Sequence, residues 1–139
     1  MIQSPRIDLF SDTKTRPSEE MRKSMIDAVV GDEQSDEDPT TLNLCEKVAD
    51  LMGHEKALFL PSGTMCNQIA LAVHCKSGDE IIADATSHII TSEVGGAASI
   101  AGAMIRPLNG INGIFQASQV EEGLRPAVRH APKSRLVVV

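Results

Sequence analysis

The stretch that decides the fold is ALFLPSGTMCNQIALAVHC, residues 57–75. Its first four residues are a short apolar run, which is typical of a buried strand, so we expect a strand over residues 57–60. Helical spacing of apolar residues begins at Met65, and we expect Ile69 and Val73 to face inward with it. Residues 61–64 lie between these two patterns. The stretch therefore predicts a strand, a turn of small residues and a helix in succession.

Two helices are predicted on the N-terminal side of this stretch. Pro17 suits the first position of a helix over residues 18–29, because proline lacks the N–H that a helix start leaves unpaired. Pro39 opens a second helix, and Gly53 suits a left-handed cap beyond its end. The acidic loop before it lacks the spacing of a calcium-binding loop, so we expect Asp38 to cap the helix instead.

The sequence that follows residues 57–75 predicts strands alternating with helices. Apolar runs at residues 80–84, 103–108 and 134–139 indicate three strands, the last typical of a central parallel strand. Asn112-Gly113 indicates a turn, and a helix over residues 118–128 has a possible capping box of Ser118 and Glu121. This alternation predicts an α/β fold with a mostly parallel sheet and helices on both faces. Because the sequence stops inside the last strand, we expect the domain to be incomplete at its C-terminus.

Composition excludes several classes of function. The 139 residues are 42% hydrophobic and 23% charged, which is typical of a globular domain. A net charge of -6 and an aromatic content of 2% argue against nucleic acid and anionic membranes as partners. Three cysteines without CxxC spacing indicate neither a disulfide framework nor a metal site. With no signal-like segment at the start, we expect a cytoplasmic protein that acts on a small molecule.

Two polar motifs are candidates for chemistry. Ser62, Gly63 and Thr64 open a helix, where free N–H groups, a positive dipole end and two hydroxyls suit a phosphate, although either hydroxyl could simply be a helix cap. His88 follows the strand at residues 80–84, so we expect it at the same edge of the sheet as the turn. A histidine there can stack on a flat ring or act as a base, although an isolated histidine is more often structural.

Five motifs in order resemble the N-terminal part of the threonine aldolase and β-eliminating lyase family. They are IDLFSDTKTRP, VGDEQSDEDPT, ALFLPSGTMCN, GDEIIADATSHI and EVGGAA. The resemblance implies the fold type I of enzymes that depend on pyridoxal 5'-phosphate (PLP). It also implies an N-terminal segment and helix over residues 1–30, followed by the first part of the PLP-binding large domain over residues 31–139.

The resemblance assigns roles to individual residues. Ser62, Gly63 and Thr64 match the turn that holds the cofactor phosphate, and His88 matches the histidine that stacks on the pyridine ring and helps to deprotonate the substrate hydroxyl. Ser11 matches a serine near the substrate carboxylate. The family's Schiff-base lysine has no match among the lysines of this sequence. The chain alone is therefore expected to be inactive.

The implied reaction is cleavage of threonine or allo-threonine to glycine and an aldehyde, by a protein that forms a dimer or tetramer in its full-length form. Two alternatives remain open. The same residues would serve a PLP-dependent β-elimination. A third possibility is a non-catalytic chain that associates with a full-length homologous subunit, because the strand at residues 134–139 would leave a sheet edge to be covered.

Overall fold

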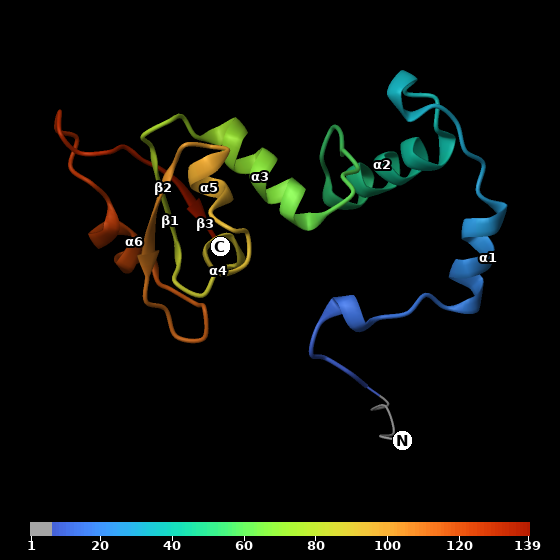
Figure 1. Cartoon of the computed structure of the whole chain (residues 1–139), viewed down its shortest axis with the longest axis horizontal. Helices are drawn as coiled ribbons and strands as arrows, with labels where there is room; N and C mark the ends of the chain where they lie inside the picture. The colour runs from blue at the N-terminus through green and yellow to red at the C-terminus, as the bar shows by residue number, and fades with distance from the viewer. Residues whose placement is uncertain (1–6) are drawn as a thin grey trace. The chain divides into compact units, whose positions relative to one another are not determined.

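The computed structural model describes residues 7–139 (Figure 1). The chain divides between Phe59 and Leu60 into two compact units, Met1–Phe59 and Leu60–Val139, and the first of these is described from residue 7 onward. The first unit contains η1 Asp12–Lys14, α1 Glu19–Asp27, η2 Glu33–Ser35 and α2 Pro39–Met52. The second contains α3 Gly63–His74, β1 Glu80–Asp84, α4 His88–Thr91, α5 Gly96–Ser99, β2 Met104–Leu108, α6 Ala117–Gly123 and β3 Ser134–Val138. The domain division expected at residues 30 and 31 stays a prediction. No helix of the described residues is both long and apolar enough to cross a membrane.

Helix α1 is shorter than its sequence pattern predicts. Ser18 is its N-cap, since the Ser18 hydroxyl accepts a hydrogen bond from the Met21 N–H at 3.2 Å. The expectation that Pro17 holds the first helical position is therefore wrong, because Pro17 lies before the cap. The helix ends at Asp27, where Ala28 takes an extended conformation. The Ser18 cap, which apolar spacing does not reveal, therefore sets the N-terminal end.

The structure confirms the caps predicted for both ends of α2. The Asp38 carboxylate accepts hydrogen bonds from the Thr41 N–H at 2.8 Å and from the Gly31 N–H at 2.9 Å. These bonds, the Thr41 bond first, lower the pKa of Asp38. At the other end Gly53 takes a positive φ of 68°, a conformation that side chains with a Cβ rarely adopt. Local residues therefore specify this helix.

The structure has no strand over residues 57–60, so that prediction is wrong. These residues form no regular element, and the side chains of Leu58 and Phe59 are exposed. A strand exists only when its backbone pairs with a neighbour, and the sheet of the second unit is built from β1, β2 and β3. A four-residue apolar run carries no information about such a neighbour.

The sheet is parallel, with strand order β2-β1-β3. All five residues of β1 are buried, so β1 is the central strand. The strand expected at the C-terminal end of the chain is confirmed as β3, although it lies beside β1 at one side of these three strands instead of in the centre.

Helices cover both faces of this sheet, as the sequence predicts. On one face Ile81 and Ala83 belong to a buried cluster. Its other members come from α3, α4, α5 and the segments beside them: Leu71, Cys75, Ile89, Ala97, Ala101 and Ala103. On the other face α6 approaches β1 and β2 so closely that a Cβ at Gly123 would lie 3.7 Å from Ile82 and 3.5 Å from Leu108 (Figure 1).

Helix α3 turns a different side inward from the one its apolar spacing predicts. Gln68 and Leu71 are buried, while Met65, Ile69 and Val73 are 43%, 37% and 72% exposed. The prediction that these three face the core of this unit is therefore wrong. Both sets have helical spacing, so the spacing alone does not choose between them.

The hairpin turn and the last helix complete the second unit. Asn112 and Gly113 both have positive φ, 54° and 82°, and Ile111 pairs with Ile114 across them, which confirms the predicted turn. Helix α6 begins one residue earlier than predicted and ends at Gly123, five residues before the predicted end, because Leu124 is extended. Its capping box is formed by Gln116 and Gln119, so the expected box of Ser118 and Glu121 is wrong.

Candidate active site

The first feature of the site is the N-terminus of α3. Ser62 is extended and its hydroxyl accepts a hydrogen bond from the Met65 N–H at 3.1 Å, while its carbonyl accepts from the Cys66 N–H. Within the described part of the chain, no acceptor is bonded to the N–H groups of Gly63 and Thr64. Ser62 is thus a helix cap, and the two N–H groups that follow it are available to an anion.

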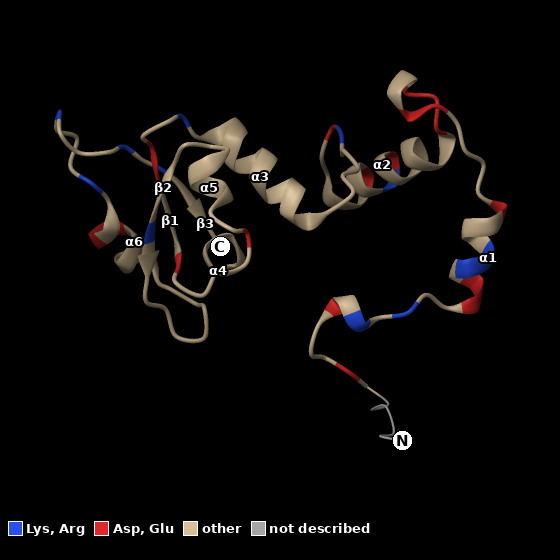
Figure 2. Ribbon diagram, in the orientation of Figure 1, with Lys and Arg blue, Asp and Glu red and all other residues tan. Residues whose placement is uncertain are grey.

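Gly63 has open space at its side-chain position. A Cβ built there would meet no atom of the described chain within 4 Å, and the backbone is helical without a positive φ. Neither packing nor conformation within this unit therefore requires a glycine at position 63. Helix α3 has no charged Asp, Glu, Lys or Arg residue along its length (Figure 2).

The second feature is His88, the first residue of α4. Its Nδ1 lies 2.8 Å from Oε1 of Glu93. The two side chains differ sharply in burial, because the His88 side chain is 60% exposed and the Glu93 side chain is 0% exposed. The imidazole is therefore held at one nitrogen from inside the unit, while much of the ring is open to solvent or to a ligand.

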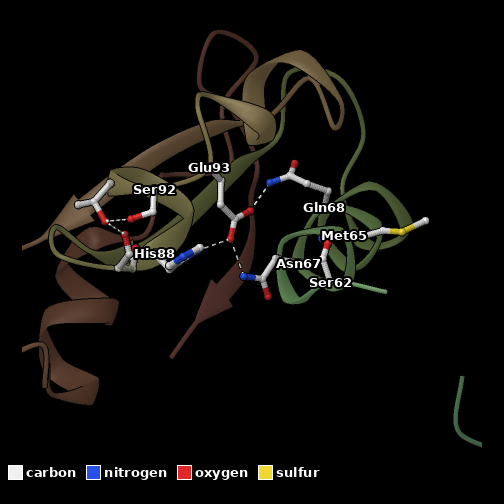
Figure 3. Close-up of polar contacts among 9 residues, drawn as sticks. Ser62, Met65, Asn67, Gln68, His88, Ser92 and Glu93 are labelled. Carbon is white, nitrogen blue, oxygen red and sulfur yellow. Dashed lines mark hydrogen bonds and ion pairs between the residues drawn. The ribbon is translucent and has the colours of Figure 1, made fainter. Parts of the chain in front are cut away.

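Glu93 is held in turn by two amides of α3 (Figure 3). Asn67 Nδ2 donates to Glu93 Oε1 at 2.6 Å, and Gln68 Nε2 donates to Glu93 Oε2. Burial is the largest single influence on this carboxyl and raises its pKa, but the hydrogen bonds from Asn67, His88 and Gln68 together outweigh it. The net pKa of Glu93 is lowered, so the buried carboxylate is charged near neutral pH.

Helix α3 joins the two features. Asn67 and Gln68 follow Gly63 and Thr64 by four residues each, so each pair lies on one face of the helix, about 6 Å apart along its axis. Through Glu93, this face also holds His88, as Figure 3 shows. The expectation that the turn and His88 belong to one site thus gains a physical link, although that link runs through α3 and not through a strand at residues 57–60.

A close backbone approach lets the amide of Gln68 reach Glu93. A Cβ at Gly96 would collide with the Gln68 amide group. Gln68 is itself 7% exposed, and its Oε1 is buried with no hydrogen-bond partner in residues 7–139. The glycine at position 96 therefore makes room for the side chain that holds the carboxylate.

Ser11 belongs to the other unit. It is the N-cap of η1, where its hydroxyl accepts a hydrogen bond from the Thr13 N–H at 3.3 Å and lies 2.8 Å from Thr13 Oγ1. The role that the family resemblance implies for Ser11 stays a prediction.

A groove in the same unit is lined by residues of η2, α2 and the segment after α2. Five acidic residues line it: Glu33, Asp36, Asp38, Glu46 and Glu55. Such a lining disfavours a phosphate, so this groove does not compete with the α3 turn for that role.

Sequence reasoning did not find Glu93, Asn67 or Gln68. The signals available were weak: one acid followed by Gly95 and Gly96, and two adjacent amides within an apolar helix. These three residues come together because α3 packs against α5 and against the segment before α5 that contains Glu93. That segment lies about 25 residues after α3 residue Gln68 in the sequence.

Comparison with known proteins identifies the family. The family model described as β-eliminating lyase matches residues 8–139. The chain is 41% identical over 121 residues to low-specificity L-threonine aldolase 1 of Arabidopsis thaliana, covering 86% of this chain and 34% of that protein. It is 38% identical over 132 residues to the low specificity L-threonine aldolase of Escherichia coli, covering 94% of this chain and 40% of that protein.

A solved structure supports the fold. It is a Listeria monocytogenes protein assigned as an L-allo-threonine aldolase, with a TM-score of 0.56, 24% identity, and coverage of 70% of this chain and 26% of that one. The chain thus spans between a quarter and two fifths of the length of these proteins. Its parallel α/β architecture is that of fold type I, incomplete here as a domain, which confirms the predicted fold class. Because the family model covers residues 8–139, the chain belongs to the β-eliminating lyase family.

Proposed function

We propose that this chain is the N-terminal, cofactor-binding part of a PLP-dependent lyase that cleaves threonine or allo-threonine to glycine and an aldehyde. The observation that carries the proposal is the link through α3: the helix that presents two free N–H groups at its start also holds, through Glu93, the exposed imidazole of His88. The names of the Arabidopsis and Escherichia coli relatives supply the substrate class.

The residues present fit a phosphorylated, flat cofactor. The N–H groups of Gly63 and Thr64 and the Thr64 hydroxyl would hold the phosphate, with Ser62 beside them, and the open space at Gly63 lets a phosphate oxygen approach the backbone. The exposed face of His88 would lie on the pyridine ring. When bound, PLP supplies an electron sink for the bond that breaks at the substrate's α-carbon.

The chain's own contribution to the chemistry is orientation and proton transfer. His88 is exposed enough to reach a substrate hydroxyl, and its contact with a buried carboxylate restricts the rotation of the ring. Removal of the hydroxyl proton by an imidazole is the proton transfer that aldol cleavage of a β-hydroxy amino acid requires. Ser11 would contact the substrate carboxylate.

We further propose that the 139-residue chain does not turn over alone. None of its six lysines, at positions 14, 23, 47, 56, 76 and 133, matches the family's Schiff-base lysine. The full-length protein would assemble as a homo-oligomer, in keeping with the family resemblance.

The test is a titration of the purified chain with PLP, followed by absorbance, and then borohydride reduction with mass measurement. We expect reversible binding that Thr64→Val and His88→Asn each weaken by about tenfold, the loss expected for one hydrogen bond to a charged group or one ring contact. Ser99→Ala, which removes an exposed hydroxyl from the same unit, is the control and should bind as the parent chain does. Equal binding by all four proteins would overturn the assignment of the turn and of His88.

The second candidate function is PLP-dependent β-elimination, which the description of the matching family favours. Products distinguish the two reactions. An aldehyde and glycine from threonine indicate aldol cleavage, whereas a keto acid indicates elimination. The measurement requires the chain joined to, or mixed with, the remainder of a full-length homologous subunit. Co-elution of the chain with a full-length homologous subunit in size-exclusion chromatography would instead favour the third possibility, a non-catalytic chain that associates with such a subunit.

A further inference from the structure

The contact between His88 and Glu93 determines where the imidazole proton lies. His88 Nδ1 is 2.8 Å from Glu93 Oε1, which is a hydrogen-bond distance. A carboxylate accepts and does not donate, and Asn67 and Gln68 already donate to both of its oxygens. The two amide donors favour the ionised carboxylate of Glu93, which can only accept at Nδ1, over a neutral carboxyl that would donate to it. The hydrogen of the contact therefore belongs to Nδ1 of His88.

We infer that Glu93 is a positioning residue which keeps the proton of neutral His88 on Nδ1, so that Nε2 is the nitrogen with the free lone pair. This inference deepens the proposed function and rests on it for the role of His88, but the tautomer itself is a property of the chain without cofactor. It names the atom, Nε2, that would accept the proton of the substrate hydroxyl.

The surroundings of Glu93 make it a firm anchor. Its side chain is 0% exposed, so water does not compete for its oxygens, and its three partners come from α3 and α4. A hydrogen bond with an ionised partner is about twice as strong as one between neutral groups. Helix α4 has only four residues, and the Ser87 hydroxyl before it makes no capping bond. The bond to Glu93, which is itself held by α3, therefore restrains His88 from outside α4.

The test is nitrogen NMR of the full chain labelled at histidine with ¹⁵N, in mildly alkaline solution where imidazoles are neutral. Loss of signals in His88→Asn identifies the His88 resonances. We expect the Nδ1 resonance at the shift of a protonated ring nitrogen and the Nε2 resonance at the shift of an unprotonated one. The opposite pattern in the unaltered chain would overturn the inference without any further variant.

Two variants separate the acceptor from general effects on folding. Glu93→Ala removes the acceptor, and the ratio of Nδ1–H to Nε2–H tautomers should fall about tenfold or more, the range that loss of a charge-assisted hydrogen bond covers. Glu80→Gln is the matched control, because Glu80 is another buried carboxylate of the same unit, held by Arg125 instead of His88. It should leave the His88 tautomer unchanged.

Each outcome decides one question. An unchanged tautomer in folded Glu93→Ala, or an equal change in Glu80→Gln, contradicts the role of Glu93. If Glu93→Ala does not fold, Glu93→Gln preserves the side-chain volume and should still lower the ratio, because a neutral amide oxygen is a weaker acceptor.

Failure of PLP to bind would contradict the proposed function and leave the tautomer result standing. Binding of PLP with the opposite tautomer would contradict only the role of Glu93.

Discussion

The two units of the chain are stabilised in different ways. Leu60–Val139 contains a buried cluster around Ile81 and Ala83, and three side chains from two helices meet at Glu93. In the described residues of Met1–Phe59, Ala49 is the one buried apolar residue, although its helices are capped by Ser18 and Asp38. Local capping specifies helices, but burial is needed to hold distant side chains in one place. The site geometry accordingly lies in the unit that has the core.

The largest difference expected between the two units is in the free energy of unfolding lost when an apolar side chain is removed. Ile81 is 0% exposed, so Ile81→Ala should lower the free energy of unfolding by about 2–5 kcal/mol. Leu51 in the other unit is 83% exposed, and Leu51→Ala should change it by less than about 0.5 kcal/mol. Urea denaturation followed by circular dichroism measures both. Equal effects would contradict the conclusion that buried apolar side chains stabilise the second unit more than the first.

A pair of glycines gives the next largest contrast. Gly96→Ala should destabilise the chain by about 1–3 kcal/mol, because its Cβ would collide with the Gln68 amide, which Glu93 holds in place. Gly63→Ala should stabilise it by about 0.4–1 kcal/mol, since the space is open and the backbone helical. The same denaturation assay tests both, and a neutral Gly96→Ala would mean that Gln68 moves away freely.

The two serine caps give a smaller contrast between the units. Ser62→Ala should cost about 1 kcal/mol, because α3 carries part of the core of its unit. Ser18→Ala removes the same kind of bond from α1, which has no buried residue. Amide hydrogen exchange should then increase within α1 alone for Ser18→Ala and across the sheet for Ser62→Ala. A purely local increase for Ser62→Ala would contradict the coupling of α3 to the core.

The smallest expected effect is on the pH dependence of stability. The pKa of Glu93 in the folded chain lies below its ordinary value of 4.5, so the unfolded chain binds the proton first as the pH falls. The stability that Glu93 contributes is complete above pH 4.5 and is lost as the pH falls through the lower, folded pKa. Unfolding free energies across the acid range should therefore rise less steeply with pH in Glu93→Gln. The exposed Glu122→Gln controls for the loss of a charge, and an equal slope in both variants would contradict the prediction.

How much could be predicted depended on how local each feature is. The cap of α2 by Asp38, its Gly53 end and the Asn112-Gly113 turn were predictable, because neighbouring residues decide them. The strand at residues 57–60 was wrong, since strand formation depends on a partner distant in sequence. The inward face of α3 was wrong for the same reason, because Gln68 and Leu71 are buried by what lies against them.

The sequence by itself determined the family, the alternation of strands and helices in the second unit, and the candidate residues Ser62, Gly63, Thr64 and His88, because motifs and short-range spacing carry that information. Only the tertiary structure decided that Asn67 and Gln68 hold Glu93, which in turn contacts His88. A buried carboxylate must find its donors wherever the fold brings them, and here the two amide donors come from a helix about 25 residues earlier in the chain.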